Sequence, residues 1–149
     1  MYNDEKEEKV IANRVMTPDG TILWSRYTHD YVQYHDKVSD EDYMLDGGTE
    51  YQRAFVNKVP AKNMTVTSQD PWEVQREFRL RGTFDSMGVR VWVPLSKLSN
   101  DHIKALMDLM SNTNSIYHRE LQYRKEHNID IADHDYANEG VEAITHTKE

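Results

Sequence analysis

The residues able to do chemistry are concentrated between Thr17 and Arg53, where histidines, aromatic residues, turn signals and an arginine lie close together. The most suggestive spacing is an Asp-Gly-Gly triplet followed by a tyrosine and an arginine. Two consecutive glycines permit positive φ and leave backbone N–H groups unshielded, as in an anion-binding nest. The arginine adds a forked donor for a phosphate, nucleotide or carboxylate. The residues of this predicted ligand-binding site are His29, Asp30, Asp46, Gly47, Gly48, Tyr51 and Arg53.

A structural interpretation of the same segment is favoured over the ligand site. In it the glycines close a tight turn, Asp46 caps the segment that follows, and Arg53 pairs with Asp30 or Asp46.

The adjacent pair His29-Asp30 also resembles the signature of metal-dependent phosphohydrolases that are named for a His-Asp pair. Those sites need further His and Asp ligands from separate helices, whereas this pair lies between predicted strands. A structural role, with the histidine donating to a carbonyl and the aspartate closing a turn, is favoured. The pairs His35-Asp36 and His134-Asp135 are expected to be solvated loop residues.

A second cluster combines arginines with aromatic residues, which is typical of interfaces and of base-stacking surfaces. A surface strand with salt bridges to neighbouring glutamates is the alternative interpretation. The predicted interface residues are Trp72, Arg76, Arg79, Arg81, Arg90 and Trp92, with Phe78 and Phe84 interleaved.

Composition excludes several classes of function. The 149 residues include no cysteine, which rules out disulfides, thiol catalysis and cysteine-ligated metals. A net charge of −8 disfavours direct DNA binding, which needs a basic surface. No apolar run approaches the roughly 18 residues of a membrane span, and the polar N-terminus is unlike a signal peptide. We therefore expect a cytoplasmic protein without membrane contact, metal or other cofactor. No catalytic triad, carboxylate pair or phosphate loop stands out.

The elements expected to position these residues form an α+β fold, with a small antiparallel β-meander and a C-terminal α-helical hairpin. In the N-terminal half, the Thr17–Gly20 turn predicts a β-hairpin over Val10–Tyr27. Strands are expected at Tyr31–Tyr34 and Tyr43–Leu45, separated by a charged loop. Residues Thr49–Val56 fit a helix or another strand.

The second half begins after a proline-containing linker at Asn57–Lys62. Val89–Val93 alternates as a strand that extends the sheet. Ser99 is a helix N-cap, followed by apolar residues at helical spacing up to Met110, and a second helix covers Ile116–His127 with Asn128 at its C-terminal end. The predicted organisation is a 1–58 β-meander subdomain, a 59–131 strand and helical-hairpin subdomain sharing its core, and a polar 132–149 tail.

The segments Ser25–Tyr31 and Asp46–Arg53 resemble a family of small phage and bacterial proteins of unassigned function. The shared pattern is a serine, then His-Asp-aromatic, then Asp-Gly-Gly-x-x-Tyr-x-Arg. Many relatives carry paired cysteines that suggest a zinc ribbon. Because this chain has none, packing of four aromatic residues would replace the metal: Trp24, Tyr31, Tyr43 and Tyr51.

Two further segments, Trp92–His102 and Glu120–Ile129, are similar to a module of tailed-phage accessory proteins. Together the two resemblances cover roughly half the chain. They imply a phage-encoded accessory protein in the cytoplasm of an infected bacterial host.

We expect this protein to act by stoichiometric binding without turnover, in counter-defence or host takeover. Its partner would be a host bacterial protein that it blocks or an anionic nucleotide signal that it sequesters, and homo-oligomerisation would enlarge its thin core. The alternatives are a small metal-dependent phosphohydrolase using His29, Asp30 and His35, and a phage regulatory or assembly adaptor working through the arginine–aromatic strands.

Overall fold

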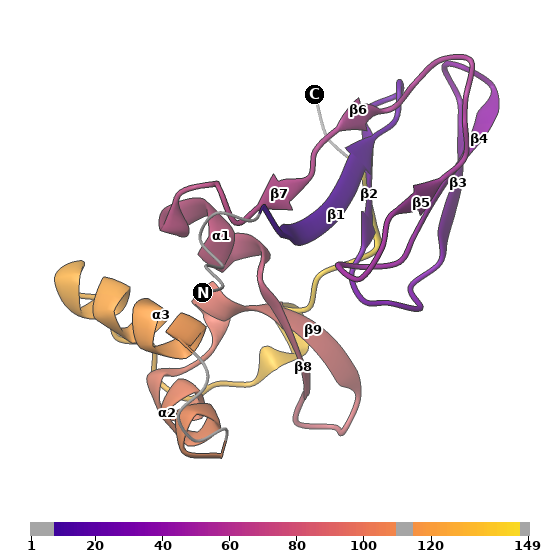
Figure 1. Ribbon diagram of the computed structural model, residues 1–149. Coiled ribbons are helices and arrows are strands. Elements are labelled where there is room, and N and C mark those ends of the chain that lie inside the picture. Colours follow the sequence, from indigo (N-terminus) through magenta and orange to yellow (C-terminus); the bar gives the residue numbers. More distant parts are fainter. Residues whose placement is uncertain (1–7, 110–114, 147–149) are drawn as a thin grey trace. The chain divides into compact units, whose positions relative to one another are not determined.

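A computed structural model describes residues 8–109 and 115–146, which form an α+β fold (Figure 1). They fall into two units. One contains the described residues up to Phe78 and those from Glu142 onward, and the other contains Arg79–Val141. Among the described residues, no helix combines the length and apolarity needed to cross a membrane.

The first sheet of the N-terminal unit is built on the predicted hairpin. Strands β1 (Val10–Met16) and β2 (Thr21–Ser25) pair antiparallel, with Asn13 opposite Ser25 and Met16 opposite Ile22. Gly20 closes the turn at φ +90°, and its N–H donates to Thr17 O at 2.9 Å. These observations confirm the predicted hairpin.

Three short strands complete this sheet. They are β6 (Lys62–Asn63), β7 (Val66–Thr67) and β10 (Ile144–His146). The strand order is β10-β2-β1-β6, and β7 also pairs with β1. The return of the C-terminal segment as β10 places a strand where the sequence predicts only a polar tail.

A second antiparallel sheet has the order β3-β4-β5, from strands β3 (Val32–Asp36), β4 (Glu41–Asp46) and β5 (Arg53–Ala54). Leu23 from the first sheet and Val32, Tyr43 and Leu45 from the second form a buried core cluster. Of the predicted helix or strand over Thr49–Val56, only the two residues of β5 adopt regular structure. Helix α1 (Trp72–Phe78) follows β7 and is the last element before the chain enters the second unit, with the Phe78 ring 5.5 Å from that of Trp24.

The second unit consists of a β-hairpin and two helices. Strands β8 (Leu80–Phe84) and β9 (Arg90–Pro94) pair only with each other in the described chain, so the Val89–Val93 segment does not extend the N-terminal sheet as predicted. Short 3-10 turns lie at Leu95–Lys97 and Tyr136–Asn138.

Helices α2 (Asn100–Leu109) and α3 (Ser115–Glu126) form the predicted helical hairpin. The Ser99 hydroxyl accepts the His102 N–H at 3.0 Å, which confirms the predicted N-cap. Asn128 follows α3 at φ +56°, as expected of the residue after a helix C-terminus. Ile103 and Leu106 are buried, while the predicted apolar position Met110 lies outside the described residues.

The buried Arg124 side chain joins α3 to the start of α2 and to the 3-10 turn before it. The Arg124 Nε donates to Glu120 Oε2 at 2.7 Å, and both side chains are almost fully buried. The same guanidinium donates to Asn100 Oδ1 at 2.7 Å and to Leu95 O at 3.1 Å. One residue therefore joins three segments of this unit.

The division of the chain differs from the predicted boundary after residue 58. Strands β6 and β7 pair with β1, which places residues 62–67 in the first sheet. The boundary lies between Phe78 and Arg79, and the chain returns to the first unit at Glu142. Pro60 therefore lies in a loop within the first unit, because the strands that follow it, β6 and β7, pair with β1 of the same unit.

Candidate functional site

The Asp46-Gly47-Gly48 segment reverses the chain directly after β4. Gly47 and Gly48 have φ angles of +98° and +55°. A Cβ on Gly47 would lie 1.8 Å from the Tyr51 carbonyl oxygen, and one on Gly48 would lie 2.4 Å from the Tyr27 carbonyl carbon. The turn therefore requires glycine at both positions, because neighbouring backbone occupies the space of a side chain.

The N–H groups of both glycines are engaged within the chain. Gly47 donates to Asp46 Oδ1 at 2.8 Å and Gly48 donates to Ser25 Oγ at 2.9 Å. The Gly47 carbonyl accepts the N–H groups of Glu50 and Tyr51 at 3.1 and 3.3 Å. The donors that the sequence offered to an anion thus already stabilise the turn.

Ser25, at the end of β2, connects this turn to the His29-Asp30 loop. Its hydroxyl accepts the Gly48 N–H and donates to the Asp30 carbonyl at 2.9 Å. The Asp30 carboxylate is buried and accepts the backbone N–H and the Nε–H of Arg26 at 2.9 and 2.8 Å. The Asp30 loop and the Asp-Gly-Gly turn are therefore brought together, and a buried serine outside the predicted set joins them.

Arg53 forms an ion pair with Asp46, one of the two partners that the structural interpretation offered. The Arg53 Nη2 lies 2.5 Å from Asp46 Oδ2. The Asp46 carboxylate raises the pKa of Arg53. The two side chains are 62% and 7% exposed, respectively, so the guanidinium presents itself to solvent while its partner is buried.

Tyr51 and Tyr31 lie beside this guanidinium, whereas Tyr27, whose ring is 5.8 Å from the Arg26 guanidinium, lies on the adjoining loop. Tyr27, Tyr31 and Tyr51 are all exposed, and Arg53 lies 6.0 Å from the centroid of Tyr51. Exposure of Tyr31 and Tyr51 corrects the expectation that they pack in the core with Trp24 and Tyr43, which are buried. Val32, the first paired residue of β3, is buried. Because successive side chains of a strand point to opposite faces, the ring of the preceding residue, Tyr31, points outward. We call Tyr27, Tyr31, Tyr51 and Arg53 the tyrosine–arginine surface.

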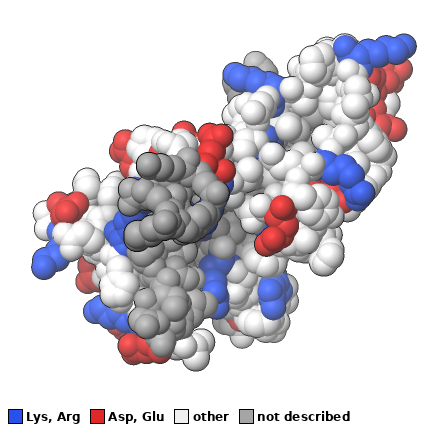
Figure 2. Space-filling model, viewed as in Figure 1, with Lys and Arg blue, Asp and Glu red and all other residues white. Residues whose placement is uncertain are grey.

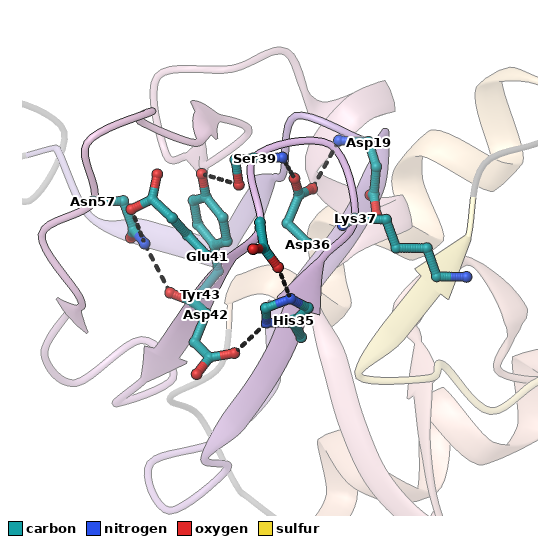
Figure 3. Close-up of polar contacts among 10 residues, drawn as sticks. Asp19, His35, Asp36, Lys37, Ser39, Glu41, Asp42, Tyr43 and Asn57 are labelled. Carbon is teal, nitrogen blue, oxygen red and sulfur yellow. Dashed lines mark hydrogen bonds and ion pairs between the residues drawn. The ribbon is translucent and has the colours of Figure 1, made fainter.

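The histidines proposed for metal chemistry do not share a site. His29 is exposed in the loop before β3, whereas His35 belongs to β3. The His35 Nδ1 and Nε2 lie 2.7 and 2.8 Å from carboxylate oxygens of Asp42 and Asp40 (Figure 3). These acceptors, Asp42 first, raise the pKa of His35. Within residues 8–109 and 115–146, no group of three His, Asp or Glu side chains is placed to hold a metal ion.

Asp36, predicted as a solvated loop residue, is fully buried at the end of β3. Its carboxylate accepts the backbone N–H groups of Ser39 at 2.6 Å and Asp19 at 2.8 Å (Figure 3). Burial acts to raise the pKa of Asp36, but these donors outweigh it and lower that pKa. Asp19 in turn accepts the Tyr34 hydroxyl at 2.6 Å. The two aspartates thus tie the β1–β2 turn to the β3–β4 hairpin.

The six predicted interface residues do not form one surface. Trp72 and Arg76 are buried in the first unit, and the other four belong to the second unit. Burial, followed by the nearby charge of Arg119, lowers the pKa of Arg79. Arg81 and Trp92 are half-buried. Only Arg90 is exposed, where it lies 5.0 and 5.5 Å from the centroids of Phe84 and Trp92.

The second unit holds a polar cluster that the sequence did not predict, beside a hollow of about 570 Å³. The Tyr136 hydroxyl accepts the Ser99 N–H at 2.8 Å and forms a second hydrogen bond with His102 Nδ1 at 3.0 Å. Burial, and then the charge of Arg81, lowers the pKa of His102. The Ser99 hydroxyl accepts the His102 N–H as the N-cap of α2 and donates to Asp133 at 2.6 Å.

On the face shown in Figure 2, acidic and basic side chains of the described residues are interspersed among uncharged surface. The described residues on this face form no broad basic area of the kind that binding of a nucleic-acid backbone requires. Comparisons with protein-family models, with curated proteins and with solved structures find no match. The arrangement of this chain's own residues is therefore the basis for a functional proposal.

Proposed function

We propose that this chain is a phage-encoded accessory protein that binds a host bacterial protein stoichiometrically and blocks it, in counter-defence or host takeover. The observation that carries the binding proposal is the tyrosine–arginine surface, in which the exposed rings of Tyr31 and Tyr51 lie beside the exposed Arg53 guanidinium and Tyr27 is exposed on the adjoining loop. Tyrosine and arginine are enriched among residues that dominate binding energy at protein interfaces.

The way in which this surface is held supports a recognition role. The Asp46–Arg53 ion pair anchors the guanidinium, while both glycines of the turn are fixed by close backbone contacts. Tyrosine presents a large rigid area at low conformational-entropy cost. Binding through preorganised groups loses less free energy to ordering than binding through mobile side chains.

A protein partner fits these residues better than a nucleotide does. A phosphate at the turn would compete with Asp46 Oδ1 and Ser25 Oγ for the N–H groups of Gly47 and Gly48. The buried Asp46 carboxylate also places a negative charge beside Arg53. A protein surface that presents apolar groups and one carboxylate would instead use the exposed rings and the remaining guanidinium donors.

The phage and host-takeover parts of the proposal rest on the two sequence resemblances. The structure adds that the serine, His-Asp and Asp-Gly-Gly parts of the first pattern lie together in space. The hydrogen bonds that join these segments explain their spacing, and no catalytic role is needed to explain it.

Affinity capture from bacterial lysate tests the proposal with two matched variants. Tyr31 and Phe84 are comparably exposed aromatic residues, at 52% and 56%, and lie in different units. We expect Tyr31→Ala to weaken capture of one host protein at least about tenfold, since central aromatic residues contribute about 2 kcal/mol or more. Phe84→Ala should leave capture unchanged. Loss with Phe84→Ala and retention with Tyr31→Ala would overturn the proposed surface.

A further inference from the structure

Two hollows lie side by side in the first unit, between the ends of its two sheets. One, of about 270 Å³, is lined by residues that include Gln52, Arg53 and Asn63. The other, of about 280 Å³, is lined by residues that include Tyr43 and Phe55. Both hollows are also lined by the same three residues, Val15, Ala54 and Ala61. They therefore adjoin, and we call them together the edge groove.

The edge groove is flanked by the last strands of both sheets. β5 ends the order β3-β4-β5, and β6 ends the order β10-β2-β1-β6. β5 pairs with β4 and β6 pairs with β1, and no pairing joins β5 to β6 in the described chain (Figure 1). An edge strand presents backbone N–H and C=O groups that can pair with an added strand.

The groove combines an apolar end with a polar end. Val15, Tyr43 and Phe55 contribute apolar surface on one side, whereas Asn63 and Arg53 line the other. Each hollow lies just below the volume usual for a small-molecule site, so each suits one side chain of a longer ligand. A peptide in extended conformation directs alternate side chains to one face, as two adjoining hollows require.

Charge identifies the kind of peptide. Residues 51–63 contain three basic residues and no acidic residue, in a chain with a net charge of −8. These residues are Arg53, Lys58 and Lys62, and all three are exposed. The nearby Glu41 carboxylate is engaged by the backbone N–H groups of Lys58 and Val59 at 2.9 and 3.0 Å. The Asp46 carboxylate that pairs with Arg53 is buried, whereas the three basic side chains are exposed, so the exposed rim of the groove is complementary to an acidic ligand.

We propose that the edge groove binds an extended segment of the partner protein, with apolar side chains in the hollows and carboxylates toward the basic rim, as an added β-strand. This inference rests on the proposed function. The bound segment would belong to the same partner protein that contacts the tyrosine–arginine surface, and that surface adjoins the groove at Arg53. Backbone pairing supplies affinity in this mode, and the hollows supply selectivity.

Selection from a display library of random linear peptides on the immobilised full chain tests this inference. We expect the selected peptides to combine Val, Ile or Phe with Asp or Glu. Selection of basic peptides, or of none, would overturn the inference.

Two valine variants then locate the binding site. Val56 lines the apolar hollow and is fully exposed, whereas Val38, in the β3–β4 turn, is exposed but lines neither hollow. Val56→Asp places a carboxylate where the peptide's own acids approach and should weaken peptide binding about tenfold or more. Val38→Asp should leave it unchanged, and equal effects of both variants would contradict the site.

Backbone pairing has its own readout. Hydrogen exchange of the chain with a selected peptide should show new protection at residues 53–56 and 61–63. Protection confined to other segments would refute strand addition. If Tyr31→Ala weakens capture of the host protein and Val56→Asp does not, the groove is not a binding site for the partner. The proposed function would then still stand.

Discussion

Substitution of Gly47 by alanine is the sharpest test of the turn that holds the tyrosine–arginine surface. Gly47 has φ +98°, and its added Cβ would lie 1.8 Å from the Tyr51 carbonyl oxygen. Gly88 provides a matched control, because it has φ +82° but no atom within 4 Å of the corresponding Cβ position. The two substitutions therefore share the backbone strain and differ in the collision.

The expected magnitudes follow from this difference. Strain at positive φ costs an alanine about 1–2 kcal/mol, which is the expected loss of stability for Gly88→Ala. In Gly47→Ala the turn must also move away from the backbone of Tyr51, since the colliding atom is not the end of a flexible side chain. We expect a total loss above about 3 kcal/mol, in the range produced by severe steric conflict.

Urea unfolding followed by circular dichroism measures these losses, and hydrogen exchange assigns them to a unit. Gly47→Ala should reduce protection in β3, β4 and β5, and Gly88→Ala only in β8 and β9. Because the turn fixes Tyr51 and Arg53, Gly47→Ala should also abolish capture of the partner. Equal losses of stability in the two variants would refute the claim that backbone packing fixes this turn.

Two other predictions concern the remaining polar groups. Arg124→Met should destabilise the second unit by about 3–5 kcal/mol in urea unfolding, because it removes the ion pair to the buried Glu120 carboxylate and the hydrogen bonds to Asn100 Oδ1 and Leu95 O; a loss below about 1 kcal/mol would contradict this role. The pKa of His35 is raised above its unfolded value, so its bonds to Asp42 and Asp40 stabilise the hairpin below the unfolded pKa and are lost as pH rises through the folded pKa. NMR titration of the ring should show this raised pKa, and Asp42→Asn should lower it; an unchanged titration in that variant would argue against the bridge.

Local signals in the sequence predict the local structure well. The Thr17–Gly20 turn, the Ser99 cap and Asn128 after α3 each act within a few residues, and each has the predicted role. The amphipathic spacing of Ile103 and Leu106 likewise predicts which face of α2 is buried.

Features that depend on distant pairing could not be predicted in this way. Pairing of Ile144 with Leu23 joins residues more than a hundred positions apart and turns a polar tail into a strand. Trp72 and Arg76 have the composition of an interface but are buried by the fold. In the same way, the spacing of Asp46, Gly47 and Gly48 shows donors without showing that Ser25 already engages one of them.

Native mass spectrometry of the protein purified from its bacterial expression host tests the central claim most directly. The account predicts a complex with one host protein at fixed stoichiometry, and its loss when Tyr31 is replaced by alanine. A co-purified nucleotide on the wild-type chain that is released by Arg53→Ala, with no bound protein, would contradict it.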